Sequence, residues 1–81
     1  MFFVIQKKRT SAGTWTNGVI VKETLNEALH QFHAFMSTYA YGQDASLDYC
    51  ACEVQTRDGR NIKSEIDDRI APAASNEPEE A

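Results

Sequence analysis

The chain has 81 residues, a net charge of −4 and two cysteines, and 42% of its residues are hydrophobic. This length supports one hydrophobic core, because separate domains normally need on the order of 100 residues each. No run approaches the roughly 18 apolar residues that span a bilayer, and no basic segment precedes an apolar core as in a signal peptide. These features predict one folded domain in the cytoplasm and argue against a membrane protein.

The segment 71–81 differs in composition from the rest of the chain. It contains both prolines, three glutamates and no large apolar residue, which is typical of disordered chain. Removing its three negative charges from the total of −4 leaves −1. We therefore expect a domain over residues 1–70 and a disordered acidic tail over 71–81. The domain itself is too neutral for a bulk attraction to nucleic acid or to an anionic membrane.

Strand-forming residues dominate the first 22 positions. Residues 2–8 have apolar side chains on both faces, which predicts a strand, and residues 10–14 have the composition of a loop. A second strand is expected at about 15–22. It contains Asn17-Gly18, the dipeptide most favoured in tight hairpin turns. This dipeptide marks either a turn or a bulge in a longer strand, and we favour the bulge.

The residues that follow carry the clearest signal, an amphipathic helix. Thr24 and Glu27 match the capping box, in which each side chain accepts a hydrogen bond from the backbone N–H of the other residue. Apolar residues then recur at steps of three and four, on one stripe that faces a core. These residues are Leu25, Ala28, Leu29, Phe32, Phe35, Met36 and Tyr39. Gly42 is expected to close the helix in a left-handed conformation.

Two further strands are expected at 47–56 and at about 60–67, joined by a hairpin at Asp58-Gly59. A two-residue loop would pair Val54 with Lys63, which mixes apolar and polar residues on both faces. We therefore predict a three-residue loop at 57–59 with Gly59 left-handed. Its pairs are Val54–Ile62, Cys52–Ser64 and Cys50–Ile66 on the core side and Glu53–Lys63 on the other side.

These elements predict an α+β fold of order β-β-α-β-β, in which a single helix packs on a four-stranded, mainly antiparallel sheet. The potential metal ligands on the helix are Glu27, His30 and His33. Steps of three residues rotate these side chains apart by about 60° each, so they do not converge. Cys50 and Cys52 lack the further ligands of a zinc site and fit small core positions. We predict no metal, no cofactor, no catalytic residue and a non-enzymatic protein.

Two candidate binding sites remain. Tyrosine beside acidic residues suits a protein interface. The expected protein-binding residues are Tyr41, Asp44, Asp48, Glu53 and Glu65. The alternative is a single-stranded nucleic acid that stacks on a tryptophan and follows neighbouring cations. Its residues are Lys7, Lys8, Arg9 and Trp15, joined by Arg57 and Arg60 if the strands are neighbours. Such a basic strand end also serves to discourage edge pairing.

Three segments resemble short uncharacterised proteins from phages and mobile elements of gut Firmicutes. They are FHAFMSTYAYG at 32–42, LDY at 47–49 and EIDDR at 65–69. The similar proteins have no established activity and no known catalytic residues, so the resemblance suggests neither for this chain.

The leading expectation is a small accessory or regulatory module that binds an unidentified protein partner through the outer face of the sheet, Tyr41 and the nearby acidic residues. The resemblance and the acidity add one subclass, a phage or mobile-element inhibitor of a host enzyme such as an anti-restriction or anti-CRISPR protein. The alternative is the nucleic-acid-binding module. A homodimer through a sheet edge is left open, because a four-stranded open sheet has two edges.

Overall fold

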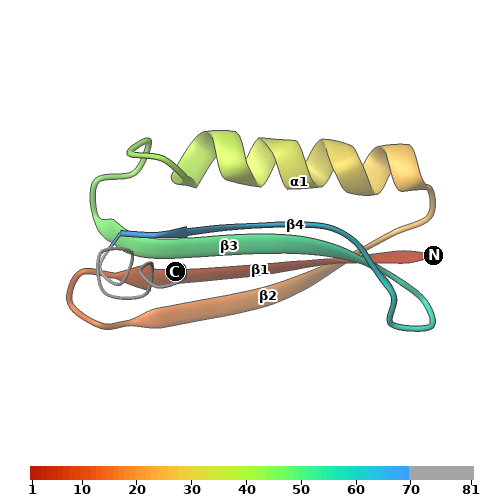
Figure 1. Cartoon of the computed structure of the whole chain (residues 1–81), viewed down its shortest axis with the longest axis horizontal. Coiled ribbons are helices and arrows are strands. Elements are labelled where there is room, and N and C mark those ends of the chain that lie inside the picture. The colour runs from red at the N-terminus through yellow and green to blue at the C-terminus, as the bar shows by residue number, and fades with distance from the viewer. Residues whose placement is uncertain (70–81) are drawn as a thin grey trace, which may run out of the picture.

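The computed structural model describes residues 1–69 and places one helix against a four-stranded sheet (Figure 1). The elements are β1 (Phe2–Thr10), β2 (Trp15–Lys22), α1 (Leu25–Tyr39), β3 (Leu47–Thr56) and β4 (Asn61–Asp68). The strands lie in the order β2-β1-β3-β4, and all neighbours are antiparallel. The predicted α+β class and element order are confirmed. The predicted tail at 71–81 lies outside the described residues.

The helix begins where the capping box predicts. Thr24 Oγ1 accepts from the Glu27 N–H at 3.2 Å, and Glu27 Oε1 accepts from the Thr24 N–H at 3.3 Å. At the other end the helix stops at Tyr39, because Ala40 already has an extended backbone. Gly42 is left-handed, as predicted, but it does not close the helix. The left-handed residue that directly follows the C-cap Ala40 is Tyr41, so the predicted position of the helix end is wrong.

The core lies between α1 and the two central strands. Its buried residues are Val4, Ala28, Phe32, Phe35, Met36, Ala40, Leu47, Cys50, Cys52 and Val54. Phe32 is the largest side chain that is fully buried, and burying a phenylalanine contributes roughly 1.5–3 kcal/mol. Leu25 is exposed, so its predicted core position is wrong. It lies at the first turn of the helix, where it lines an open hollow with Met1 and Phe2.

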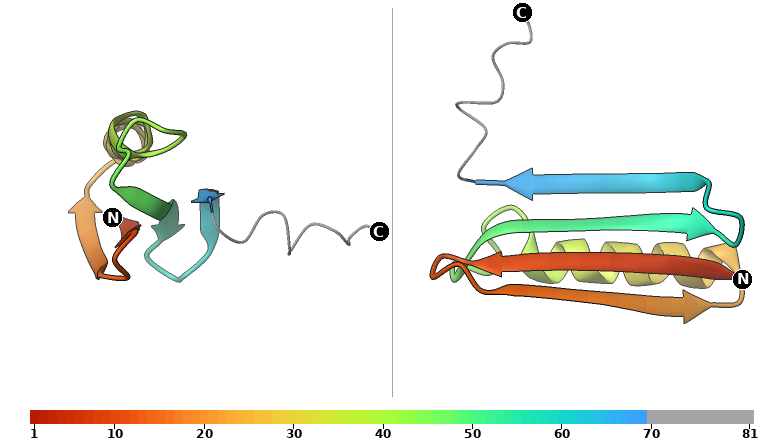
Figure 2. Two further views of the ribbon diagram at one scale, coloured as in Figure 1. Left: turned by 90° about the vertical axis from the view of Figure 1, so that its left-hand side faces the viewer. Right: turned by 90° about the horizontal axis from the view of Figure 1, so that it is seen from below.

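One helix is too narrow for this sheet. An α-helix with its side chains is about 10 Å wide, whereas strands lie about 4.8 Å apart, so one helix covers roughly two strands. α1 packs mainly on β3 and β1 and less on β2. Figure 2 shows the helix on one side of the sheet and, from below, no element of the described chain in front of the four strands. We call this second side the uncovered face.

β2 runs straight through Asn17-Gly18. Its register with β1 is uniform from the pair Phe2↔Lys22 to the pair Arg9↔Trp15. The predicted bulge is therefore wrong. The chain turns instead at residues 11–13, within the predicted loop, where Gly13 is left-handed.

The hairpin between β3 and β4 begins as predicted. Gly59 is left-handed, the Thr56 N–H donates to the Arg60 carbonyl at 2.8 Å, and Gln55 pairs with Asn61. The register then shifts by one residue at Ile62, and Val54 pairs with Lys63. This pair belongs to the register of a two-residue loop, which mixes apolar and polar residues on both faces.

The shift overturns all four predicted pairs. The observed pairs are Val54↔Lys63, Glu53↔Ser64, Cys52↔Glu65, Ala51↔Ile66 and Cys50↔Asp67. Paired residues share a face, so Lys63, Glu65 and Asp67 lie on the helix side of β4 and Ile66 lies on the uncovered face. The physical reason is that β4 lies beyond the width of the helix, so its helix side has no core to fill.

Candidate functional site

The uncovered face carries a group of apolar side chains. Because alternate residues of a strand point to opposite faces, the cross-strand pairs assign the members of this group. Its apolar members are Phe3, Ile5, Trp15, Val19, Val21, Tyr49, Ala51 and Ile66. Val19 and Ile66 are 60% and 63% exposed, and Trp15 and Val21 are about half exposed. These four side chains make the uncovered face available for an apolar contact.

Two opposite charges interrupt this apolar surface near its centre. Lys7 on β1 and Glu53 on β3 line a hollow of about 110 Å³, together with Ile5, Ala51 and Ile66. The Glu53 carboxylate also accepts a hydrogen bond from the side-chain amide of its neighbour on the same face, Gln55. The predicted binding residue Glu53 therefore belongs to the uncovered face.

Strand alternation divides the predicted basic cluster. Lys7 and Arg9 lie on the uncovered face, whereas Lys8 lies on the helix side with its Nζ 4.0 Å from the centre of the Tyr39 ring. Arg57 and Arg60 lie at the turn after β3, at the opposite end of the sheet from Arg9. They do not extend the cluster, and the expectation that they would is wrong.

Arg9 has several partners on the uncovered face. Its Nε donates to Asp48 Oδ1 at 2.6 Å, and its guanidinium lies 5.3 Å and 5.6 Å from the ring centres of Trp15 and Tyr49. The two rings meet edge to face with their centres 5.3 Å apart. These contacts hold the exposed Trp15 ring in one position. They also leave the predicted binding residue Asp48 in an ion pair and largely buried.

A second candidate surface lies where the chain leaves the helix. Tyr41 has a φ of 55°, a left-handed conformation that is rare for a bulky residue. Its N–H donates to Asp67 Oδ2 at 2.7 Å, while its side chain is 60% exposed beside Glu65. Partial desolvation and a hydrogen bond with the Glu65 carboxylate raise the pKa of the Tyr41 hydroxyl above 10.0. Tyr41 and Glu65 thus form one small surface.

The Arg69 side chain makes hydrogen bonds that hold Asp67 and the backbone next to this surface in place. Its Nε donates to Asp67 Oδ2 at 2.9 Å, and its Nη1 donates to the carbonyls of Asp44 and Leu47 at 3.0 Å and 2.7 Å. Its Nη2 donates to the Tyr39 carbonyl at 3.0 Å. One guanidinium therefore ties the end of α1, the loop after it and the end of β4 together. We call this arrangement the Arg69 clasp.

The Asp44 carboxylate makes its hydrogen bonds within the loop between α1 and β3 and is not part of the surface formed by Tyr41 and Glu65. Its Oδ1 accepts from the Ser46 N–H at 3.0 Å and from Ser46 Oγ at 2.6 Å. These two hydrogen bonds hold the pKa of the Asp44 carboxyl below 3.8. Of the five predicted protein-binding residues, the structure brings Tyr41 and Glu65 together, and Glu65 also lines the hollow of about 110 Å³ with Glu53.

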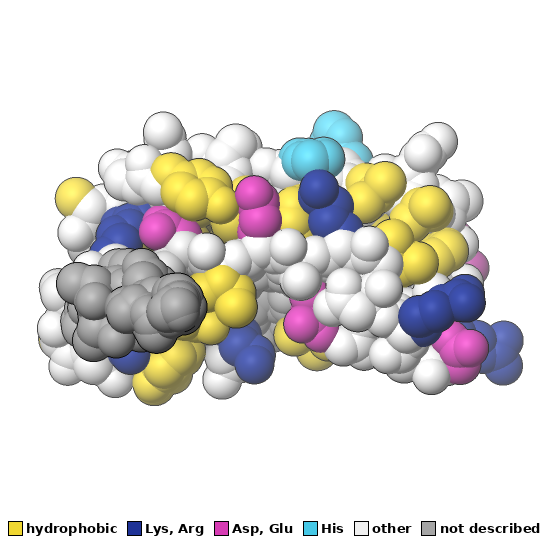
Figure 3. All heavy atoms as spheres, viewed as in Figure 1, with side chains coloured by type: hydrophobic (Ala, Val, Ile, Leu, Met, Phe, Trp, Pro, Cys, Tyr) yellow, Lys and Arg dark blue, Asp and Glu magenta, His cyan; other side chains and the backbone are white. Residues whose placement is uncertain are grey.

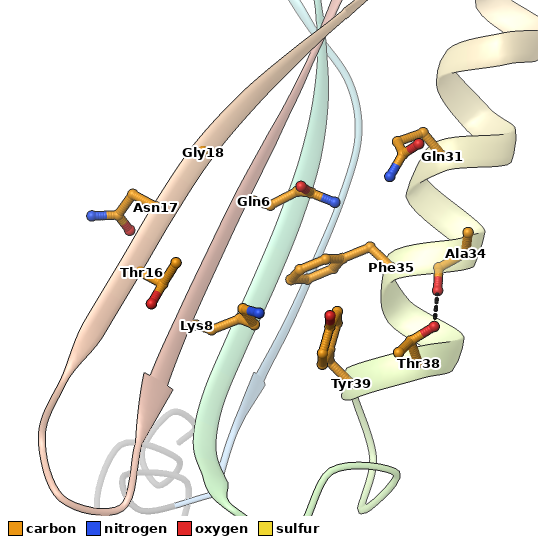
Figure 4. Close-up of a pocket in the computed structure, with 10 residues that line it drawn as sticks. All are labelled: Gln6, Lys8, Thr16, Asn17, Gly18, Gln31, Ala34, Phe35, Thr38 and Tyr39. Atoms are coloured by element: carbon orange, nitrogen blue, oxygen red, sulfur yellow. Dashed lines mark hydrogen bonds between the residues drawn. The ribbon is translucent and has the colours of Figure 1, made fainter.

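A groove of about 360 Å³ runs between α1 and the β2 side of the sheet (Figure 4). Its lining is Gln6, Lys8, Thr16, Asn17, Gly18, Gln31, Ala34, Phe35, Thr38 and Tyr39. The side chains of Gln6, Phe35 and Tyr39 point toward the groove, whereas Asn17 points away from it (Figure 4). Most of the lining is neutral, so the groove offers little charge to a ligand.

The cysteines and histidines do not form a reactive centre. Cys50 and Cys52 are free and buried, and burial raises the pKa of both thiols, that of Cys52 to about 12. They therefore stay protonated at neutral pH. The histidines are exposed on the outer side of the helix, above a side of the molecule with mixed charges (Figure 3). Within residues 1–69, no group of three histidines, cysteines or acids is placed to hold a metal ion.

The chain matches no protein-family model, no curated protein and no solved structure. No helix within residues 1–69 is long and apolar enough to cross a membrane.

Sequence reasoning missed the apolar part of the uncovered face. It placed Ile66 on the core side, and the wrong register of β4 caused this error. A usable signal was present in β2, where Val19, Ile20 and Val21 put apolar residues on both faces of one strand. One helix cannot bury both faces of a strand, so one of the two apolar faces has to stay open.

Proposed function

We propose that this protein is a small non-enzymatic binding module that docks another protein on the uncovered face of its sheet. One observation carries the proposal: four exposed apolar side chains, from Trp15, Val19, Val21 and Ile66, share a face that no described element covers. Phe3, Ile5 and Ala51 on the two central strands lie between the three residues of β2 and Ile66 of β4, and an exposed apolar patch of this kind marks an interaction site.

The arrangement of the face supports a protein ligand. Trp15 is held by Arg9 and Tyr49, so little side-chain entropy is lost when a partner covers the ring. Tryptophan and tyrosine are the residues that most often dominate binding energy at protein interfaces. Lys7 and Glu53 supply one charge of each sign within the apolar surface and orient the partner.

A pull-down with the tagged full chain from lysate of the source organism tests the proposal. The lysate is treated with nuclease, and captured proteins are identified by mass spectrometry. The test variants are Val19→Lys and Ile66→Lys, and the matched control is Leu25→Lys, which adds the same charge at an exposed apolar position on the helix. We expect both test variants to lose the captured protein at least tenfold and the control to retain it. Equal capture by all three would contradict docking on the uncovered face.

Single-stranded nucleic acid is the second candidate ligand. The observation that favours it is that two aromatic rings, Trp15 and Tyr49, lie on the same face as Lys7. The ion pair of Arg9 with Asp48 and the charge of Glu53 weigh against it. Binding of a labelled oligonucleotide should fall steeply with salt and with Lys7→Glu, and a flat salt response would argue against this ligand.

The subclass that we propose is an inhibitor of a host enzyme, which the resemblance to phage and mobile-element proteins and the acidity support. An acid that imitates a phosphate has to be available to the enzyme, whereas Asp48 and Asp67 are held by arginines. Glu65, beside the exposed Tyr41, is the informative position. If the captured protein is a nucleic-acid enzyme, Glu65→Lys should weaken its binding, and unchanged binding would remove the mimicry hypothesis.

A further inference from the structure

The outer edge of β2 is an unprotected strand edge. β2 is eight residues long, keeps a uniform register with β1 and has no proline. Its residues 15–21 carry no charge, and all but Ile20 are exposed. Within residues 1–69, no strand pairs with its outer side. Long, straight and uncharged edges of this kind pair with another strand unless something blocks them.

The backbone groups on this edge can be assigned. Thr10 and Thr14 form a hydrogen-bonded pair at the start of the hairpin, because the Thr10 N–H donates to the Thr14 carbonyl at 2.9 Å. Hydrogen-bonded and non-hydrogen-bonded pairs alternate along an antiparallel ladder. Every second residue of β2 therefore turns its N–H and C=O away from β1. These residues are Trp15, Asn17, Val19 and Val21.

The space beside this edge is open to an added strand. α1 packs mainly on β3 and β1 and less on β2, and the groove beside it leaves the helix side of β2 accessible. The helix residues that line this groove, Gln31, Ala34 and Thr38, are uncharged. Lys8, the one charged residue of the groove lining, lies over the Tyr39 ring, so the groove presents no cluster of like charges to a second copy of the chain.

We propose that two copies of this chain pair antiparallel through their β2 edges, with Gly18 on the two-fold axis, and form one continuous eight-stranded sheet. In this register each outward-facing residue meets an outward-facing residue of the second copy, Trp15 with Val21 and Asn17 with Val19. Four such residues on each copy exchange about eight main-chain hydrogen bonds. Both helices then lie on the same side of the joint sheet.

The occupant is a second copy because β2 complements itself in this register. Trp15 meets Val21, an aromatic residue against a β-branched one, and Thr16 meets Ile20, two β-branched residues, which are favourable cross-strand pairs. No pair opposes like charges. The other edge is less suited to pairing, because β4 carries charged residues from Lys63 to Asp68 and a register shift at Ile62.

The mass of the full chain in solution gives the first test. We expect sedimentation equilibrium to show a species of twice the 9.1 kDa chain mass, with a fraction that rises with protein concentration. Gly18→Asp should shift the population to the monomer by at least tenfold in the dissociation constant, because it opposes two carboxylates on the axis. The site tolerates the change, since no atom lies within 4 Å of an added Cβ. Circular dichroism and the Tm confirm that the variant folds.

Cysteine cross-linking tests the register. Gly18 and its counterpart would form a non-hydrogen-bonded pair with Cα atoms about 4.5 Å apart, which a disulfide can bridge. Under mild oxidation Gly18→Cys should give a covalent dimer. Thr16→Cys should not, because its counterpart lies four residues further along the ladder, about 13 Å away. Ser64→Cys on β4 is the control for the other edge.

Three outcomes would overturn the proposal. The first is a monomer at every concentration together with no cross-link of Gly18→Cys. The second is a dimer that Gly18→Asp leaves intact. The third is a dimer in which Ser64→Cys cross-links and Gly18→Cys does not. This test is independent of the proposed function. A dimer joined at β2 leaves its uncovered face accessible, so the pull-down can succeed or fail whether or not the chain forms this dimer.

Discussion

The two edges of the sheet differ in how well they are protected against pairing with another strand. β4 carries charged side chains along its length and a register shift at Ile62, and both features discourage pairing with another strand. β2 has neither feature between Trp15 and Val21. The comparison teaches that protection of an edge strand is local, and that the chain protects one edge while it leaves the other available.

The two edges are also attached to the fold by different forces. On β2, Ile20 is partly buried and packs against the core. On β4, polar groups dominate the contacts with the rest of the fold. Lys63 lies 5.3 Å from the centre of the Phe32 ring, and Asp67 and Arg69 belong to the Arg69 clasp. The attachment of β2 should therefore respond to lost apolar volume, and that of β4 to lost hydrogen bonds.

The largest effect is expected at the core on which both edges depend. Phe32→Ala leaves a cavity under the helix and should lower the free energy of unfolding by about 3–5 kcal/mol. Urea denaturation followed by circular dichroism measures this loss. Gln31→Ala, one residue earlier on the same helix, is the control and should change stability by less than about 0.5 kcal/mol. A loss of similar size for both would show that the core has been misplaced.

Breaking the Arg69 clasp should have the next largest effect. Arg69→Ala leaves Asp67 without this partner and removes hydrogen bonds from three carbonyls, so we expect a loss of about 2 kcal/mol. Arg69→Lys should not restore it, because an ammonium lacks the planar fork that reaches these groups together. Hydrogen exchange should quicken in β4 more than in β2. Arg57→Ala at the exposed turn is the matched control, and exchange that quickens equally in both edges would count against the clasp.

The same truncation on the two edges should give unequal effects. Ile20→Ala on β2 should cost about 2 kcal/mol, because this side chain packs on the core. Ile66→Ala on β4 should cost less than about 0.5 kcal/mol, because the side chain is mostly exposed. Thermal or urea unfolding of the two variants makes the comparison directly. Equal losses would mean that the uncovered face contributes to folding after all.

The smallest expected effect is on the thermal stability of the protein at acidic pH. Hydrogen bonds from Ser46 lower the pKa of Asp44 below 3.8 in the folded state. A carboxyl with a lowered pKa stabilises the fold above its unfolded pKa, and this contribution is lost as the pH falls through the folded value. Asp44→Asn should therefore show a smaller fall in Tm between about pH 6 and about pH 2.5 than the natural chain. In Ser46→Ala, the Asp44 pKa measured by NMR should rise toward 3.8, and an unmoved pKa would contradict the assigned cause.

The parts of the fold that the core dictates could be predicted from the sequence. The capping box at Thr24 fixed the start of the helix, and the stripe around Phe32 identified its buried face. The alternation of Cys50, Cys52 and Val54 identified the buried face of β3. These signals are strong because the helix and the central strands bury each other, so each pattern has only one stable arrangement.

The edge strands could not be predicted in the same way. The register of β4 was chosen so that Ile62 and Ile66 would face the core, but the sheet order places β4 outside the helix. The order of strands depends on long-range pairing that the local pattern does not contain. For the same reason the sequence did not show that Arg69 returns to the end of the helix, or that Asp48 is held by Arg9. The candidate site lies largely on these parts of the chain.

The uncovered face has an evolutionary consequence. Val19 and Ile66 contribute little to folding, so natural selection for stability alone leaves them free to vary. A complete set of substitutions, scored for protein abundance in cells, should give nearly uniform values at these two positions and sharp losses at Phe32. Any constraint that appears at Val19 and Ile66 when the same set is scored for capture of the partner protein would record function directly.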